Sequence, residues 1–306
     1  MTTDSRHVSV LTTGGTIACT TGPDGSLVPT VPGGELLAAV DTDVALRVRE
    51  LTRLDSSSIT LAQIDALIGA VHRELADPRV AGVVVTHGTD SMEDSAIALD
   101  CVHDDPRPVV LTGAQRAFAH PAADGPANLT AAVELAADPR ARGRGVLLSF
   151  GGRTVPARGA VKRHTTDLDA FVPATPEPLP RPAPLPVSPL AGTEVMVLAA
   201  WPGAGRELVD AAVALGAHGL VIEAMGSGNI GAGMGQGVAD ALTAGVAVVV
   251  STRVAAGEVA LAYGGAGGGA TLATHGAVAA GHLRAGQARM VLATALAAGR
   301  PVTDLL

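Results

Sequence analysis

The stretch that decides the fold is Leu11-Thr12-Thr13-Gly14-Gly15-Thr16-Ile17-Ala18, near the start of the chain. The apolar residues from Val8 to Leu11 predict a short strand, which must end at the paired glycines. Gly14 and Gly15 allow a sharp turn and bring backbone N–H groups close to whatever binds there. Thr16 is therefore expected at the carboxyl end of a strand, where open α/β sheets bind ligands. A plain turn explains such a stretch at least as often.

A second stretch repeats this design, and it reads Val83-Val84-Val85-Thr86-His87-Gly88-Thr89-Asp90-Ser91-Met92-Glu93-Asp94. A buried strand is again followed by a glycine turn, and a Thr-Asp pair then stands where a helix begins. Asp90 and Glu93 also fit a capping box, in which two polar side chains satisfy the N–H groups of the first helical turn. That interpretation requires no function.

Taken together, the two stretches resemble the signatures of the asparaginase family. The first signature of that family is a TGGTIA run, found here from Thr13 to Ala18. The second is similar to HGTDTMEE, found here from His87 to Asp94, with Ser91 where threonine is usual. The resemblance implies a two-domain α/β amidohydrolase that converts L-asparagine to L-aspartate and ammonia.

Charge and composition restrict the partners. The 306 residues carry a net charge of −8, whereas nucleic acids and anionic lipids attract basic surfaces. No segment offers the roughly 18 uninterrupted apolar residues of a membrane span, and the N-terminus does not read as a secretory signal. The isolated Cys19 and Cys101 fit reduced thiols in the cytoplasm. No HExxH or CxxC pattern occurs, so we expect neither a metal nor another cofactor.

Strands alternate with helices in both halves, which predicts parallel sheets with helices on their faces. We expect a larger N-terminal catalytic domain at 1–172 and a smaller C-terminal α/β domain at 191–306. Residues 173–190 contain eight prolines, favour extended polyproline geometry and are interpreted as a linker.

The patterns also predict individual elements. In the first half we expect a mobile Gly/Pro-rich loop over the site at 20–34, helices at 35–40, 61–71, 91–102 and from 125, and strands at 48–53, 108–113 and 145–151. In the second half we expect strands at 193–200, 219–223 and 246–251, and helices at 206–215, 236–244 and 287–298.

The polar run Leu54-Asp55-Ser56-Ser57-Ser58-Ile59-Thr60 lies just before the helix at 61–71. Thr60 is well placed to cap that helix, and a serine run before a helix is usually cap and loop. In the asparaginase family a D-S-S or G-S turn at this place supplies a serine for the α-carboxylate of the substrate. The resemblance assigns this role to Ser56, with Ser57 as its neighbour.

Two further runs, Gly113-Ala114-Gln115-Arg116 and Ala123-Asp124-Gly125-Pro126-Ala127-Asn128-Leu129, are similar to family segments. The second begins a helix with proline in its first turn, as helix-entry rules prefer. A third run, from Val161 to Asp167, reads by itself as a solvated basic turn. The family places its catalytic lysine in a K-x-x-T-T-D context, and Lys162 occupies that context here.

The run Gly226-Ser227-Gly228-Asn229-Ile230-Gly231 follows a predicted strand and matches the dinucleotide fingerprint GxGxxG. A true fingerprint needs an acidic residue at the end of the next strand, and that strand ends in Ser251-Thr252 instead. Abundant glycine explains the match better. In the asparaginase family a G-x-G-N run stands here, and its asparagine reaches the site of a neighbouring subunit. The resemblance assigns this role to Asn229 and implies a homo-oligomer.

Amide hydrolysis needs a nucleophile, a base, oxyanion donors and groups that hold the charged ends of the substrate. By resemblance Thr16 is the nucleophile, and Thr89, Asp90 and Lys162 form a second catalytic group. Asp90 would also hold the α-ammonium of the substrate. Burial favours the neutral amine of a lysine, whereas a nearby carboxylate favours the ammonium, so the sequence leaves the charge of Lys162 open.

Backbone groups complete the predicted site. The N–H groups of Gly15 and Thr89 are the expected oxyanion donors. Gly88 and Ala114 are expected to line the pocket for the substrate.

The chain departs from the family pattern at two places. The loop at 20–34 carries Leu27 about where the family has a tyrosine that activates the nucleophile, and Tyr263 is the single tyrosine of the chain. The run from Tyr263 to Gly269 offers no counterpart of the glutamate that many members contribute from a neighbouring subunit.

Several alternatives stay open. They are a glutaminase or another amidase, an amidase subunit of a tRNA-dependent amidotransferase, and a binding protein with a silent site. An oxidoreductase that uses the glycine run at 226–231 is the weakest of them.

Overall fold

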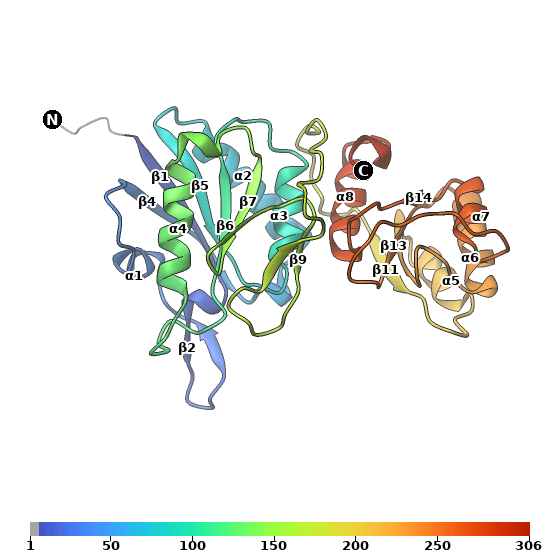
Figure 1. Cartoon of the computed structure of the whole chain (residues 1–306), viewed down its shortest axis with the longest axis horizontal. Helices are drawn as coiled ribbons and strands as arrows, with labels where there is room; N and C mark the ends of the chain where they lie inside the picture. Colours follow the sequence, from blue (N-terminus) through green and yellow to red (C-terminus); the bar gives the residue numbers. More distant parts are fainter. Residues whose placement is uncertain (1–5) are drawn as a thin grey trace. The chain divides into compact units, whose positions relative to one another are not determined.

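The computed structural model describes residues 6–306. These residues form two compact units, which meet in the sequence between Pro173 and Ala174 (Figure 1). We call residues 6–173 the first unit and residues 174–306 the second unit. Each is an α/β unit built on a mainly parallel sheet, as the alternation of strands and helices predicts.

The first unit contains a six-stranded sheet in the order β4-β1-β5-β6-β7-β8. Its strands are β1 (His7–Gly14), β4 (Leu46–Leu54), β5 (Val80–Thr86), β6 (Val109–Thr112), β7 (Val146–Phe150) and β8 (Arg153–Pro156). The first five in the sheet order run parallel, and β8 pairs antiparallel with β7. Every residue of β1 is buried, because strands covered by helices on both faces need apolar residues on both.

Helices cover both faces of this sheet (Figure 1). They are α1 (Gly33–Ala38), α2 (Leu61–Leu75), α3 (Met92–Asp100) and α4 (Gly125–Ala137), with 3₁₀ turns at η1 (Thr16–Ala18), η2 (Ser56–Ser58) and η3 (Pro139–Ala141). One core cluster packs α1 and α4 against β1, β5 and β6, through side chains such as Val10, Val84 and Leu129. Thr60 caps α2 in a complete capping box with Gln63, as its place before the helix predicts.

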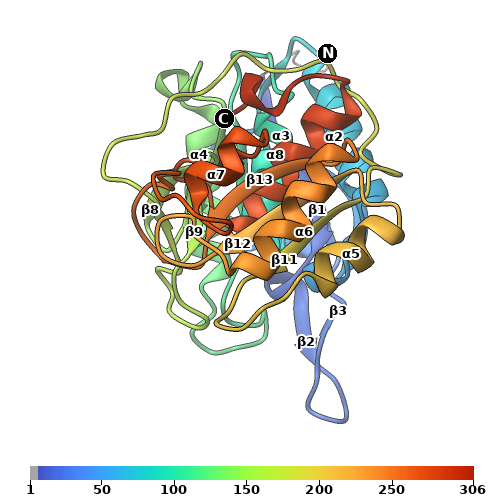
Figure 2. The same ribbon diagram turned by 90° about the vertical axis from the view of Figure 1, so that its right-hand side faces the viewer.

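Short antiparallel hairpins extend from the first unit. The predicted loop at 20–34 contains most of one, formed by β2 (Cys19–Thr21) and β3 (Leu27–Pro29), so the prediction of a loop without strands is wrong. Strands of three residues are too short to show a period, which explains the error. A second hairpin joins β9 (Ala160–Lys162) to β10 (Phe171–Pro173). Both views show the β2–β3 hairpin extending outward (Figures 1 and 2). The side chain of Leu27 in this hairpin is exposed.

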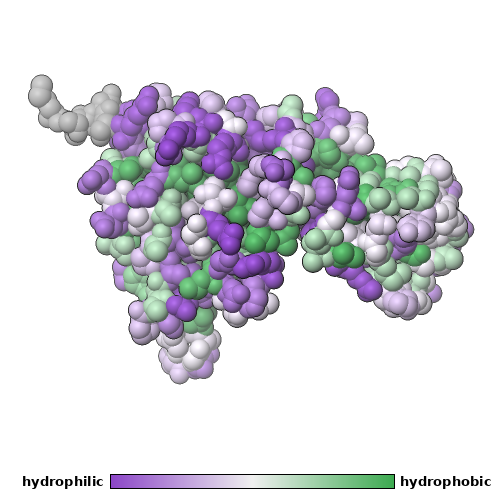
Figure 3. All heavy atoms as spheres, in the orientation of Figure 1, coloured by the Kyte–Doolittle hydropathy of each residue, from purple (hydrophilic) through white to green (hydrophobic). Residues whose placement is uncertain are grey.

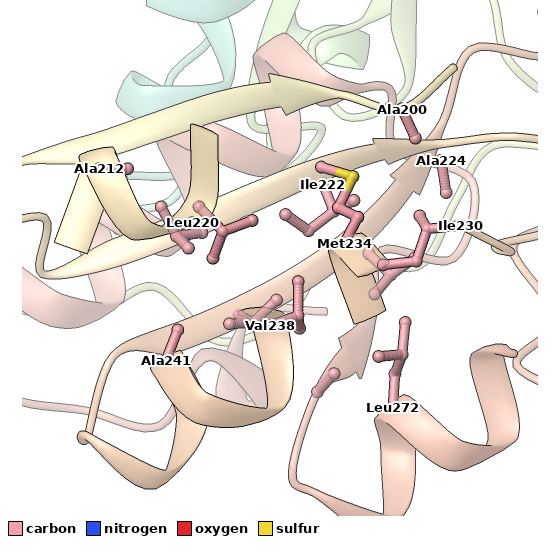
Figure 4. Close-up of a cluster of buried hydrophobic side chains, with 14 of the residues drawn as sticks. Ala200, Ala212, Leu220, Ile222, Ala224, Ile230, Met234, Val238, Ala241 and Leu272 are labelled. Carbon is pink, nitrogen blue, oxygen red and sulfur yellow. The ribbon is translucent and has the colours of Figure 1, made fainter. Parts of the chain in front are cut away.

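The second unit contains a parallel four-stranded sheet in the order β11-β12-β13-β14. Its elements are β11 (Val195–Ala199), α5 (Glu207–Ala214), β12 (Gly219–Ala224), α6 (Ala232–Thr243), β13 (Ala247–Thr252), α7 (Gly269–Thr274), β14 (Val278–Ala279), α8 (Ala285–Ala297) and η4 (Val302–Asp304). Figure 2 shows α5 and α6 on one side of the sheet and α8 on the other. The core between the sheet and α6 joins Leu220 and Ile222 to Met234 and Val238 (Figure 4).

Helix α6 begins four residues before the predicted start, at Ala232 rather than Gln236. Glycines in its first turns hide the helical period from the sequence. One of them is required by packing, since a Cβ on Gly235 would overlap the carbonyl oxygen of Ala266. Between β10 and β11, residues 174–194 form no helix or strand.

Hydrophilic and hydrophobic residues are interspersed on the face of each unit shown in Figure 3. Within residues 6–306, none of the helices combines the length and apolar character needed to cross a membrane. Cys19 and Cys101 are buried and form no disulfide.

Candidate active site

Four neighbouring strands of the first unit bring the predicted residues to one edge of the sheet. Strands β4, β1, β5 and β6 are adjacent and parallel, so their carboxyl ends meet at that edge. Directly beyond those ends lie Ser56, Gly15 and Thr16, Gly88 to Asp90, and Ala114. From β1 the chain adds β4 on one side of the sheet and β5 on the other, so the strand order reverses between β1 and β5. Open α/β sheets bind ligands at such a switch point.

The two glycine turns touch each other through their backbones. Gly15 has a φ of 78°, and a Cβ placed on it would lie 2.5 Å from Cα and N of Gly88. A Cβ on Gly88 would overlap Oγ of Ser56. These positions therefore need glycine, and the absence of side chains there brings the turn that carries Thr16 against the turn that carries Thr89.

Lys162 joins the second turn through its amine. Nζ of Lys162 donates to Oγ1 of Thr89 at 2.8 Å and to Oδ1 of Asp90 at 2.9 Å. The side chain of Lys162 is 19% exposed and that of Asp90 is 58% exposed, so the ion pair lies at the mouth of the site rather than in its interior. The structure thus brings together Thr89, Asp90 and Lys162, which are up to 73 residues apart in sequence.

The backbone of Lys162 is held as well. Its N–H donates to Oε2 of Glu93 at 2.6 Å. Burial raises the pKa of Glu93 to about 7, with a smaller contribution from the negative charge of Asp94 and with the contact to Lys162 opposing the rise. Helix α3 has Ser91 as its N-cap residue, with no capping hydrogen bond from that side chain, and the N–H of Asp90 donates to Oγ of Ser56. The capping-box interpretation of Asp90 and Glu93 is therefore wrong.

The two serines of the Leu54–Thr60 run differ in their surroundings. Ser56 is 3% exposed, and its Oγ lies 3.3 Å from the N–H of Asp90. The hydroxyl of Ser57 is exposed and donates to the carboxylate of Asp55 at 2.9 Å. The structure therefore brings Ser56 to the site and directs the hydroxyl of Ser57 toward its own turn.

The predicted oxyanion donors also differ. The N–H of Gly15 donates to the carbonyl of Leu54 at 3.1 Å, and this bond removes it from the oxyanion role that the sequence suggests. The N–H groups of Thr16 and Thr89 donate no hydrogen bond within residues 6–306. These two N–H groups lie one on each of the touching turns.

Sequence reasoning did not assign any role to His87, which is fully buried behind the second turn. Its Nδ1 lies 2.7 Å from the carbonyl oxygen of Gly88, and its Nε2 lies 2.9 Å from Oγ of Ser95. A carbonyl only accepts, so Nδ1 carries the proton and Nε2 accepts from the serine. Burial lowers the pKa of His87, which favours this neutral ring. The ring fixes the turn that carries Thr89.

The Ala123–Leu129 run holds the β6 end of the site. The carboxylate of Asp124 accepts from the N–H of Gln115 at 3.0 Å and from that of Arg116 at 2.9 Å. The amide of Asn128 donates to the carbonyl of Gly113 at 3.0 Å and accepts from the N–H of Gly151 at 3.0 Å. These bonds fix the loop on which Ala114 lies.

Asn229 belongs to the second unit and lies in the turn after β12. Its Oδ1 accepts from the N–H of Gly269 at 3.2 Å. At the end of β13, where a dinucleotide site requires a carboxylate, Thr252 donates to the carbonyl of Gly226 at 2.6 Å. Over the part of the chain that the structure describes, no three His, Cys, Asp or Glu side chains are grouped so as to hold a metal ion.

Comparison with known proteins relates the whole chain to one family. Residues 7–182 match the model described as "Asparaginase, N-terminal", and residues 194–305 match the "Glutaminase/Asparaginase C-terminal domain". A probable L-asparaginase of Deinococcus radiodurans is 35% identical, over 98% of this chain and 95% of that protein. An L-asparaginase of Bacillus licheniformis is 32% identical, over 96% of each.

A solved structure agrees with these relatives. The crystal structure of a probable cytoplasmic L-asparaginase from Campylobacter jejuni matches with a TM-score of 0.84 and 28% sequence identity. The match covers 98% of this chain and 97% of that one. The likeness therefore extends over both units of the chain.

Proposed function

The chain belongs to the asparaginase family, and we propose that it hydrolyses L-asparagine to L-aspartate and ammonia with Thr16 as the nucleophile. The observation that carries the proposal is the contact of Lys162 with Thr89 and Asp90, on a turn packed against the turn of Thr16. A weak hydroxyl nucleophile needs a base and oxyanion donors nearby, and this edge of the sheet supplies both kinds of group.

In the first step, Oγ1 of Thr16 attacks the side-chain carbonyl carbon of asparagine and gives up its proton to the Thr89–Lys162 pair, which passes it on to the leaving nitrogen. The N–H groups of Thr16 and Thr89 stabilise the oxyanion, the C–N bond breaks, and the nitrogen takes up a proton and leaves as ammonia. An aspartyl ester of Thr16 remains. In the second step, water attacks this ester, its proton passes to the Thr89–Lys162 pair, and L-aspartate leaves as Thr16 regains its proton.

The charged ends of the substrate need partners of opposite charge or hydrogen-bond donors. Asp90, with its exposed carboxylate, suits the α-ammonium group. Ser56 suits the α-carboxylate, because its hydroxyl lies against the turn of Gly88 to Asp90. Ala114 and Gly88 then line the position of the side-chain amide.

We further propose that the chain works as a homo-oligomer in the cytoplasm. The Campylobacter jejuni relative, which is described as cytoplasmic, supports the location. The turn position of Asn229 supports its predicted contribution to a neighbouring subunit. Residues 173–190 remain our proposed linker, supported by their prolines and by the interval between the two family matches, which falls at 183–193.

The test is ammonia release from L-asparagine and, in parallel, from L-glutamine by the purified chain. Thr16→Ala is expected to lower kcat by about 10,000-fold, and Thr89→Val by a similar factor, because residues that act as a unit fail together. Thr20→Ala removes a hydroxyl that bonds Thr30, and it is expected to retain wild-type turnover. Binding of asparagine without ammonia release would favour the silent site, and full activity of both threonine variants would refute the assignment.

A further inference from the structure

Glu93 contacts the catalytic lysine at its backbone rather than at its charge. Oε2 of Glu93 accepts the N–H of Lys162 at 2.6 Å, which is short for an N–H to oxygen bond. Glu93 lies in the first turn of α3, and Lys162 is the last residue of β9. This carboxylate has no part in the chemical steps described above.

The contact fixes β9 relative to the turn that carries Thr89 and Asp90. These two residues and Glu93 lie within five consecutive positions, at and before the start of α3. Lys162 therefore meets the same segment at both ends, through its N–H and through Nζ. A long lysine side chain has many rotamers, so its amine is held accurately only if its backbone is held too.

The contact also depends on charge. The charged groups that act on Glu93 include Asp94 on α3 and Lys162 on β9. Burial raises the pKa of Glu93 to about 7, so the carboxylate gains or loses its charge in the neutral range. An ionised carboxylate accepts a stronger hydrogen bond from an N–H than a protonated one does.

We propose that Glu93 is a positioning residue for the asparaginase reaction, which holds the backbone of Lys162 so that Nζ reaches Thr89 and Asp90. This inference rests on the proposed function of the site. Above neutral pH the ionised Glu93 holds Lys162 most firmly. Below neutral pH the contact weakens, and kcat falls. The pH profile of kcat therefore has an acidic limb that is caused by Glu93.

The kinetic test compares Glu93→Ala, which removes the acceptor, with Glu93→Gln, which keeps an acceptor oxygen of the same reach. At pH 8, Glu93→Ala is expected to lower kcat by about 100-fold with KM within about threefold, because a displaced catalytic group costs about that much. Glu93→Gln is expected to stay within about tenfold of the wild type. The pH profile of kcat for Glu93→Gln is also expected to lack the fall near pH 7 that the wild type shows. Glu134→Gln, an exposed carboxylate on α4, is the matched control and keeps both rate and limb.

Three results would each overturn the proposal. They are an equal loss of kcat in Glu93→Ala and Glu93→Gln, an unchanged kcat in Glu93→Ala, and a fall of kcat near pH 7 that persists in Glu93→Gln. A second readout does not depend on turnover or on the folding of the alanine variant. In the wild type, the amide proton shift of Lys162 should follow pH with a midpoint near 7, and in Glu93→Gln it should not. If the wild type releases no ammonia but shows this titration, the proposed function fails and the contact stands. If ammonia is released but the amide proton shift of Lys162 does not change with pH, the proposed function stands and the proposed role of Glu93 fails.

Discussion

Both units place a glycine turn at the carboxyl end of a parallel strand, but the two turns are put to different uses. In the first unit, Gly15 touches Gly88, and threonines come directly after both glycines. In the second unit, a Cβ on Gly228 would lie 3.0 Å from the apolar side chains of Val259 and Leu261. Asn229 in that turn bonds the backbone of its own unit.

The difference shows that the architecture alone does not make a site. A glycine turn at a sheet edge brings backbone near backbone, and the chemistry available there depends on the residues beside the turn. In the first unit these are hydroxyls, a lysine and a carboxylate. In the second unit they are mostly apolar side chains and the glycine-rich loop before α7.

The largest difference in kcat is expected between variants that remove a positively charged side chain from the first unit and from the second unit. Lys162→Met removes the amine that bonds Thr89, and it should lower kcat for ammonia release by about 1,000-fold, within the range of lost acid–base groups. Arg206→Met breaks exposed ion pairs with Asp210 and Asp240 in the second unit. Such pairs contribute little, so kcat should stay within about twofold. A comparable loss in both variants would show that chemistry is not confined to the first unit.

Matched glycine substitutions test the turns themselves. Gly15→Ala places a Cβ at positive φ and against Gly88, so it should destabilise the chain by about 2–5 kcal/mol and lower kcat by about 100-fold. Gly226 has a φ of 53°, and a Cβ placed on it would have no atom within 4 Å. Gly226→Ala should therefore lower the free energy of unfolding by only about 1–2 kcal/mol, without a change in kcat. Chemical denaturation and ammonia assays on both variants measure these effects. Similar losses of activity would remove the distinction between the turns.

The pH dependence of stability should be traceable to Glu93 in the first unit. The folded state raises the pKa of Glu93 from its ordinary value of 4.5 to about 7, so the folded state binds the proton more tightly. Its contribution is therefore full below pH 4.5 and is lost as pH rises through about 7, a change of about 3 kcal/mol. The difference in unfolding free energy between wild type and Glu93→Gln isolates this contribution from that of His87, whose lowered pKa acts in the opposite direction. A difference that does not vary with pH would place the titration elsewhere.

The smallest expected effect separates two neighbouring serines. Ser56→Ala removes a buried hydroxyl beside Asp90 and should raise KM for asparagine about tenfold, as the loss of a hydrogen bond to a charged group does. Ser57→Ala removes a hydroxyl that bonds Asp55, and KM should change by less than about twofold. Steady-state assays with asparagine decide this, and the opposite order would move the carboxylate contact to Ser57.

The sequence predicts those features that local pattern determines. The apolar runs of β1 and β5 indicate buried strands, and Thr60 indicates the start of α2. The family signatures indicate the cluster of Thr89, Asp90 and Lys162, which the structure brings together.

Other features depend on partners distant in sequence. Glu93 fits a local capping rule, yet it bonds Lys162, 69 positions away. The N–H of Gly15 looks available in the sequence, yet the pairing of β1 with β4 brings the carbonyl of Leu54 to it. Neither long-range contact has a periodicity or a spacing that a single sequence reveals.

Because β1 lies between β4 and β5, the chain should tolerate a cut shortly after β1. The turn of the β2–β3 hairpin, at residues 22–26, extends from the first unit only a few residues after Thr16. A single cut in that turn would divide the chain into a short peptide that contains Thr16 and a long remainder that contains Lys162. Because β1 is hydrogen-bonded on both sides and wholly buried, we expect the two pieces to stay associated as a split enzyme.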